Sequence, residues 1–531
     1  MLSVLSSRSH AVDVPKPTPL SSSSLSVLGG VLLVFLIAFP WFAGGVFQSD
    51  EVRNLNTVHG VSGPYTPLDH FETIWGWRLF RPLDHLISPS LSDPATRESG
   101  SALLLHLPAV LALLLALRVA ARRVAPDMPL LFAAAVIVWC VHTATSLALW
   151  QPDLPGQTWS GAAGAWLGLV LWSGVDHARA GGGTTRHAAG LALISLIGVL
   201  SKETFLGWCF AAAVFWLLVM WRSRSLGESV PFARWAVLAA GFGLVPVLYL
   251  SARFISGGLA EVGDTGGRYS FQFATVPVNM AILLLGFLPT GPSHAVLGLP
   301  GAALWVRALP GLAVGSCLAL CLARPALVWW LGGREGDGPA RTVALGVVLF
   351  TYLSLAAVFP TGRPSEGYLM GPNVGAALIV ALGALDGARL LAARRASAQR
   401  RRWRAAAVAY GVVVLVAAGL TLYGLGSRAR HVSLTWEGSI ALFNEIETQQ
   451  QAKATVEHPL WIVVPDACLQ PRYSQIIIDP AYAVNVKQTV AWLNHVHPNR
   501  PLLLDKPESR LGPDANTFAL PCAELPPRPQ W

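Results

Sequence analysis

Two adjacent carboxylates, Asp50 and Glu51, directly follow an apolar run that ends near Phe47. A carboxylate held beside a membrane surface can take the proton of a hydroxyl group as that hydroxyl attacks an electrophilic carbon. Acids at this place also simply mark the water interface of an apolar helix, and both interpretations stay open. The pair predicts a catalytic carboxylate, Asp50, that acts as general base, with Glu51 beside it.

Cationic and aromatic side chains follow in the same segment. Arg81 and His85 belong to the stretch 75–85, whose apolar residues fall on one helix-like face and whose aromatic rings suit a bilayer surface. An arginine can hold an anion with two parallel hydrogen bonds. The segment therefore predicts an amphipathic surface that carries an acid and binding groups, Arg81 and His85, for an anionic substrate.

A second pair of charges, Lys202-Glu203, stands between two apolar runs. Each charge at bilayer depth costs up to about 2.5–3.5 kcal/mol on insertion scales, and less near the interface. Either the two charges neutralise each other in a tight helical turn, or Lys202 faces a phosphate while Glu203 orients it. The second interpretation makes both of them substrate-binding residues.

Polar groups near the ends of two other apolar runs are further candidates. His142 lies near the end of one run and is either a donor that packs helices together or a contact to substrate. A later loop joins Arg363, Glu366 and Tyr368, which suits an interfacial anchor or a substrate-binding loop. These four residues complete the predicted binding set.

The elements that position these residues follow from composition. Of 531 residues, 53% are hydrophobic and only 13% are charged, against about 25% charged in soluble domains. A membrane-spanning helix needs about 20 apolar residues. The sequence predicts an α-helical polytopic membrane protein with about eleven spans, near 25–47, 101–121, 128–150, 158–176, 187–201, 204–221, 234–255, 302–331, 341–359, 372–393 and 404–425. The apolar piece 273–289 is flanked by prolines, and we expect it to be re-entrant or interfacial.

The net charge of +9 comes from short basic clusters between the apolar runs, so it is a topology signal and not a nucleic-acid surface. The clusters alternate with basic-poor loops. The positive-inside rule therefore predicts a cell inner-membrane protein with a cytoplasmic N-terminal segment, 1–24, and an extracytoplasmic C-terminus. The outer segments that could hold chemistry are then 48–100, 256–301 and 426–531.

The tail 426–531 predicts a small extracytoplasmic α/β domain. Helical patterns cover 436–454 and 482–496, and short apolar strands are expected at 460–464, 476–478 and 502–504. The tail holds two cysteines, Cys468 and Cys522, which an oxidising compartment would allow to form a disulfide.

The order of these features resembles a known family. An acid after the first helix, an Arg-Pro-Leu with a following His, a Ser-Lys-Glu between helices and a late Glu-x-Tyr-Leu resemble the GT-C superfamily of polytopic glycosyltransferases, especially protein O-mannosyltransferases and related bacterial membrane proteins. The resemblance spans roughly residues 25–425, the expected GT-C-like transmembrane domain. It implies a polyprenyl-phosphate sugar donor used at the outer face, Asp50 as catalytic acid, and Arg81, Lys202 and Arg363 as cations near the lipid phosphate.

These residue types fit one reaction. Asp50 would take the proton of an acceptor hydroxyl, on a protein or an envelope glycan, as the oxygen attacks the anomeric carbon. The lipid phosphate would leave from the opposite face, which predicts inversion. No tightly bound cofactor is expected, and two adjacent acids do not establish a divalent metal site. A transporter or flippase for lipid-linked glycans, or a non-catalytic envelope scaffold, is the alternative.

Overall fold

The structure is a computed structural model. It describes residues 28–34, 101–142, 155–255, 339–360, 366–394, 441–463, 486–505 and 516–520, together with isolated positions at 56, 61, 145, 273–287 and 405–415. The described chain is mostly helical, with a small parallel sheet near its C-terminus. This agrees with the expected class of a helical protein with an α/β tail.

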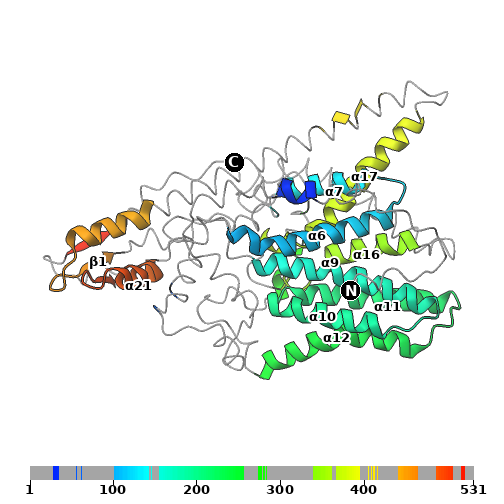
Figure 1. The fold of residues 1–531 in the computed structure, drawn as a ribbon, viewed down its shortest axis with the longest axis horizontal. Helices are drawn as coiled ribbons and strands as arrows, with labels where there is room; N and C mark the ends of the chain where they lie inside the picture. Colours follow the sequence, from blue (N-terminus) through cyan, green and yellow to red (C-terminus); the bar gives the residue numbers. More distant parts are fainter. Residues whose placement is uncertain are drawn as a thin grey trace, which may run out of the picture.

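The helices lie side by side in one bundle (Figure 1). They are α6 (Ser101–Val124), α7 (Leu131–Val141), α9 (Pro155–Arg179), α10 (Thr185–Ser201), α11 (Phe205–Ser225), α12 (Phe232–Ile255), α16 (Pro339–Leu353) and α17 (Pro372–Arg394), with 3-10 turns η3 (Phe273–Thr275) and η5 (Glu366–Leu369). Among the described residues, α11 and the part of α12 from Phe232 to Ala252 are long and apolar enough to cross a membrane.

Most expected spans that fall on described residues are helices, but two are shorter than their apolar runs. The run 128–150 contains α7, which ends at Val141 because His142 is extended (ψ 135°). The run 341–359 contains α16, and turns follow from 354 to 360. The expected spans 302–331 and, for all but single positions, 404–425 lie outside the described residues, as does most of 25–47.

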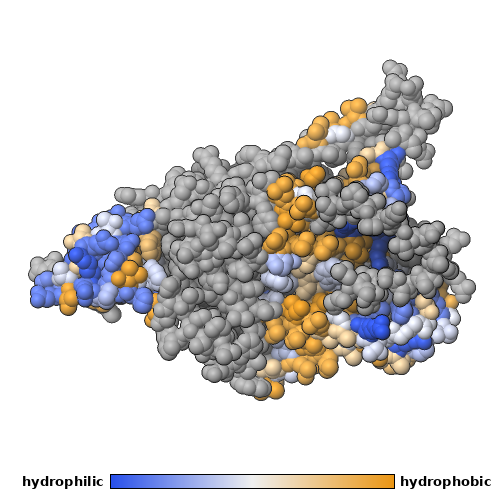
Figure 2. Space-filling view, in the orientation of Figure 1, coloured by the Kyte–Doolittle hydropathy of each residue, from blue (hydrophilic) through white to orange (hydrophobic). Residues whose placement is uncertain are grey.

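Apolar side chains cover the middle of the described helices on the face drawn in Figure 2. Figure 2 shows hydrophobic side chains over the middle of the helices and hydrophilic ones over the right-hand end of the bundle and over the α/β unit. Large apolar side chains are exposed on the outer helices, among them Leu196, Phe210, Leu244 and Leu248. Apolar patches of this extent mark a surface that meets lipid or another protein.

Basic side chains gather at one end of the bundle, which we call the arginine end and define by Arg123, Arg179, Arg222 and Arg234. Arg179 donates to Ser223 Oγ (2.9 Å) and pairs with Glu228 (3.1 Å). Arg234 donates to the Ala178 carbonyl (3.2 Å). Helices α6, α9, α11 and α17 end at this end of the bundle, and α7, α10, α12 and α16 begin at it. The described basic loops thus share one end, as the charge pattern predicts.

A clamp at the arginine end ties α17 to the turn between α6 and α7. Arg389 donates to Asp127 Oδ2 (2.6 Å) and to the Asp127 carbonyl (2.7 Å). The hydrogen bond from Arg389 holds the pKa of the Asp127 carboxyl below its ordinary value. The carboxylate therefore contributes stability above the unfolded-state pKa, and this contribution is lost as pH falls through the lowered folded-state pKa.

We expect Asp127→Asn to lower the midpoint of thermal unfolding slightly at pH 7 and low salt, since the pair is exposed. The difference from wild type should shrink as the pH falls through the lowered pKa. Thermal scans at a series of acidic pH values check this. A deficit that persists unchanged at the most acidic pH would show that the carboxylate charge is not its source.

Glycines let four helices touch closely at the opposite end of the bundle, where α9, α11 and α17 begin. A Cβ added at Gly161 of α9 would lie 2.6 Å from the Gly371 Cα, just before α17. A Cβ added at Gly207 of α11 would overlap the carbonyl oxygen of Ser354, which follows α16. Small residues at crossing points allow helix backbones to approach closely. We call this region the glycine crossing, comprising Gly161, Gly207 and Gly371.

We expect Gly207→Ala to destabilise the bundle by about 1–3 kcal/mol, because the methyl group forces α11 away from residue 354. Thermal unfolding of purified protein measures the loss. Gly243→Ala is the matched control, since nothing lies within 4 Å of a Cβ added at that position of α12. Equal midpoints for the two variants would contradict the close contact.

The C-terminal α/β unit has three parallel strands in the order β2-β1-β3: β1 (Leu460–Val463), β2 (Leu502–Asp505) and β3 (Thr517–Ala519). A helix at 441–453 and α21 (Val486–Val496) share one apolar core with the sheet. Strands β1 and β2 were expected, β3 was not, and the expected strand 476–478 lies outside the described residues. In Figure 1 the unit lies beyond the end of the bundle at which α6 begins.

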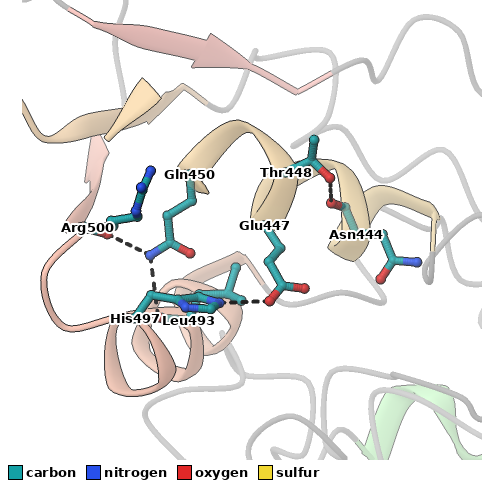
Figure 3. Close-up of polar contacts among 7 residues, drawn as sticks. All are labelled: Asn444, Glu447, Thr448, Gln450, Leu493, His497 and Arg500. Atoms are coloured by element: carbon teal, nitrogen blue, oxygen red, sulfur yellow. Dashed lines mark hydrogen bonds and ion pairs between the residues drawn. The ribbon is translucent and has the colours of Figure 1, made fainter. Parts of the chain in front are cut away.

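Polar contacts join the two helices of this unit (Figure 3). Gln450 is buried and donates from Nε2 to the carbonyl of Arg500 (2.7 Å) and to that of Leu493 (3.4 Å). His497 Nε2 lies 2.8 Å from Glu447 Oε1. These bonds fix helix 441–453 against α21 and the turn that follows it. Hydrogen bonds as well as the apolar core therefore stabilise the unit.

Candidate functional site

A small polar pocket lies beside the glycine crossing, with about 240 Å³ of space between atoms, part of it open to solvent. We call it the polar pocket. The first turns of α9 and α11, the turns after α16, and the junction of η5 with α17 form its walls. Its lining residues are Gln157, Ser160, Gly161, Thr204, Trp208, Ser354, Leu355, Val358, Tyr368, Gly371 and Pro372. Elements distant in sequence thus meet around one polar space.

Gln157 is a buried polar side chain in the wall of this pocket. It lies in the first turn of α9 and is only 5% exposed. The Thr204 hydroxyl donates to its Oε1 (3.3 Å). Its Nε2 is buried without a hydrogen-bond acceptor among the described residues. The wall of the pocket therefore contains a buried amide that is bonded to the start of α11.

The predicted pair Lys202-Glu203 forms the turn between α10 and α11. Lys202 is extended (φ −160°, ψ 140°) and its N–H donates to the Gly198 carbonyl (3.1 Å). The carbonyls of Lys202 and Glu203 accept from Phe205 and Leu206. Lys202 is only 5% exposed, and the pair directly precedes Thr204 of the pocket. The structure thus places the charges in a tight turn beside the polar pocket.

His142 lies at the same end of the bundle, where α7 stops. It is buried, and its carbonyl accepts from the Thr145 N–H (3.1 Å). Thr145 in turn accepts from Asn373 Nδ2 of α17 (3.0 Å). Trp139 of α7 donates to the Met370 carbonyl (3.5 Å). Through these bonds the end of α7 is fixed against the chain that begins α17 and lines the pocket.

Tyr368 lies in η5 and lines the pocket directly. It shares an apolar cluster with Leu283 and Phe287 of the segment expected to be re-entrant or interfacial. Asn279 of that segment donates to the Phe359 carbonyl (2.8 Å), and Phe287 meets Tyr352 edge to face at 5.5 Å between ring centroids. The segment therefore packs behind the wall that carries Tyr368.

A second space, with about 650 Å³ between atoms and part of it open to solvent, lies between the helices, and we call it the apolar cavity. It is lined by side chains of α6, α9, α11, α16 and α17, almost all of them apolar, including Leu117, Trp172, Phe215 and Phe350. The lining hydroxyl of Thr351 bonds within its own helix, to the Val347 carbonyl (2.7 Å). Trp208, Gly371 and Pro372 line both spaces, so the apolar cavity adjoins the polar pocket.

The structure brings four of the predicted residues to one end of the bundle: His142, Lys202, Glu203 and Tyr368. Glu366 is the first residue of η5. The other predicted residues lie outside the described residues: Asp50, Glu51, Arg81, His85, Arg363, Cys468 and Cys522.

Sequence reasoning missed Gln157, Ser160, Thr204 and Trp208, because none of them is charged and each stands in or beside an apolar run. One signal was available. Pro155 opens α9, and proline is favoured at the first position of a helix, so polar residues directly after it lie at a helix start.

Among the described residues there is no group of three or more His, Cys, Asp or Glu side chains that could hold a metal ion. No family model matches the chain, and no similar protein is found among curated proteins or solved structures.

Proposed function

We propose that the protein is a membrane glycosyltransferase that transfers a sugar from a polyprenyl-phosphate donor to an extracytoplasmic acceptor. The observation that carries the proposal is the shared wall of the polar pocket and the apolar cavity, formed by Trp208, Gly371 and Pro372. A ligand that fills both spaces has a polar head and an aliphatic chain. A prenyl phosphate that carries a sugar has this form.

The predicted charged residues supply the chemistry in this proposal. Asp50 takes the proton of the acceptor hydroxyl while the oxygen bonds to the anomeric carbon. The bond between that carbon and the phosphate oxygen breaks, its electrons pass to the lipid phosphate, and the configuration inverts. Lys202 and Arg81 stabilise the charge that grows on the leaving phosphate. The acceptor is a protein hydroxyl or an envelope glycan, and the arginine end faces the cytoplasm.

A flippase for lipid-linked glycans is the second candidate from the sequence. Moving a glycan across the bilayer requires a polar path through the bundle. The described cavity between the helices is instead almost wholly apolar, which suits a lipid chain and not a glycan. We therefore favour transfer at the polar pocket over transport through the bundle.

Reconstituted full-length protein tests the proposal. Vesicles would contain short-chain prenyl-phosphate mannose, glucose, galactose or arabinose with a labelled sugar, together with an extract of envelope glycans and proteins as acceptor. We expect one donor to release prenyl phosphate and to give a labelled acceptor with inverted linkage. Movement of the intact donor across the bilayer without its cleavage would support the flippase and overturn the transferase.

A further inference from the structure

A stripe of exposed apolar side chains runs along one face of α11. Phe210, Leu217 and Trp221 are each 50% exposed, and they are spaced by seven and four residues, so they lie on the same face of the helix. Arg224 continues this face three residues later and is exposed where α11 reaches the arginine end. We call these four residues the α11 stripe.

The apolar part of the α11 stripe has the length of one bilayer leaflet. From Phe210 to Trp221 it extends about 16 Å along the helix axis, and half of a hydrocarbon core is about 15 Å thick. A tryptophan and then an arginine follow, which is the order of side chains at a membrane–water interface. Helix α11 is itself long and apolar enough to cross a membrane. The stripe therefore fits the acyl chains of a lipid in the leaflet at the arginine end.

The ring of Phe232 supports the guanidinium of Arg224 at the end of the stripe. The guanidinium lies over this ring, 6.0 Å from its centroid, and Phe232 begins α12 and is 62% exposed. The two helices are joined nearby, because Trp216 of α11 donates to the Trp235 carbonyl of α12 (3.1 Å). A cation that rests on an aromatic ring still has its N–H groups for an acceptor beside the ring.

No carboxylate of the described chain balances the charge of Arg224. Glu228, the acid in the loop between α11 and α12, pairs instead with Arg179 of α9 (3.1 Å). The ion pairs of the described residues leave Arg224 out. An arginine near a membrane surface attracts anionic lipids. We infer that the α11 stripe and Phe232 form a binding site for one anionic phospholipid, whose phosphate meets Arg224 and whose acyl chains cover the apolar part of the stripe.

The inference depends on α11 crossing a membrane and not on the glycosyltransferase, so it stands or falls independently of sugar transfer. Full-length protein purified in a mild detergent is mixed with phosphatidylglycerol or with phosphatidylcholine of the same acyl chains. The two lipids differ in the net charge of the head group. Native mass spectrometry counts the lipid molecules that stay bound, gives the affinity for each lipid and shows the oligomeric state.

The variants are Arg224→Gln and Arg224→Lys. The matched control is Arg186→Gln, since Arg186 is an exposed arginine at the same end of the bundle, in the first turn of α10. We expect wild type to bind one phosphatidylglycerol more tightly than phosphatidylcholine. Arg224→Gln should bind phosphatidylglycerol about 5-fold more weakly, the contribution of one cationic side chain near a membrane surface. Arg224→Lys should keep most of the affinity, and Arg186→Gln should keep all of it.

Equal binding of the two lipids by wild type would overturn the inference, and so would unchanged affinity in Arg224→Gln. Equal losses in Arg224→Gln and Arg186→Gln would also overturn it, because the charge of the whole end would then attract the lipid. A dimer that binds no lipid would replace the phospholipid with a second copy of the chain. Thermal unfolding of each variant shows that it is folded. A loss confined to Arg224→Gln supports the lipid site, whether or not any donor gives sugar transfer.

Discussion

Asp50→Asn lowers the rate of sugar transfer by ~10²- to 10⁴-fold in our proposal, the range that a positioned general base contributes. Asparagine has nearly the shape of aspartate but cannot take the proton of the attacking hydroxyl. Membranes that contain the donor lipid are supplied with acceptor, and the labelled product is counted over time. Donor binding should change little, since the carboxylate acts on the acceptor.

The control for this experiment is Glu457→Gln, which removes an exposed acid of the α/β unit by the same chemical change. We expect it to transfer sugar at the wild-type rate. If Asp50→Asn also keeps a near-normal rate, Asp50 is not the base. The adjacent Glu51 is then the next carboxylate to test, by Glu51→Gln under the same conditions.

Gly346→Leu weakens binding of long-chain donors by about 100-fold in the same proposal. Gly346 lines the apolar cavity, and a Cβ there meets Phe215 at 3.4 Å, an ordinary contact, so the backbone need not shift. The leucine side chain fills space that about four methylene groups of the lipid would otherwise occupy. The lipid then loses roughly 3 kcal/mol of apolar burial. That loss corresponds to the stated change in affinity.

Binding of geranylgeranyl phosphate and of a four-carbon alkyl phosphate distinguishes this effect from a damaged fold. The long chain should lose affinity in Gly346→Leu while the short one keeps it, because the short chain does not reach the cavity. Gly243→Leu, at an open position of α12, should bind both as wild type does. Equal losses for both phosphates would show that the cavity does not hold the chain.

The helical part of the fold could be predicted well because apolar length determines it. The expected span 204–221 is α11, and the charges of Lys202-Glu203 fall in the turn before it. The predicted bounds are wrong where a helix ends before its apolar run does. Residues 355–359 are apolar enough to continue the helix. They form turns instead, and the Phe359 carbonyl there accepts a hydrogen bond from Asn279.

The α/β unit shows the same limit at smaller scale. Strands β1 and β2 were recognisable as runs of β-branched or leucine residues. Strand β3 has three residues, Thr517–Ala519, and is a strand because it pairs with β1 through Phe518 and Ile462. No local pattern of that length predicts a partner more than fifty residues away.

The candidate site was predicted in part. Charge made Lys202, Glu203 and His142 visible, and the structure places all three at the end of the bundle that holds the pocket. The neutral groups that line the pocket, above all Gln157, were not visible. Their importance comes from burial and from which helices begin beside them, and a single sequence does not give either.

The glycine crossing has a mechanical consequence. Helices that touch backbone to backbone can tilt about that point but cannot part there without losing the contact, and Gly161 and Gly371 touch beside the polar pocket. Side chains of the same helices line the apolar cavity farther along. If the helices move apart to admit a bulky lipid chain, they therefore separate at a distance from the glycine crossing. The distances between the residues of the polar pocket then stay fixed.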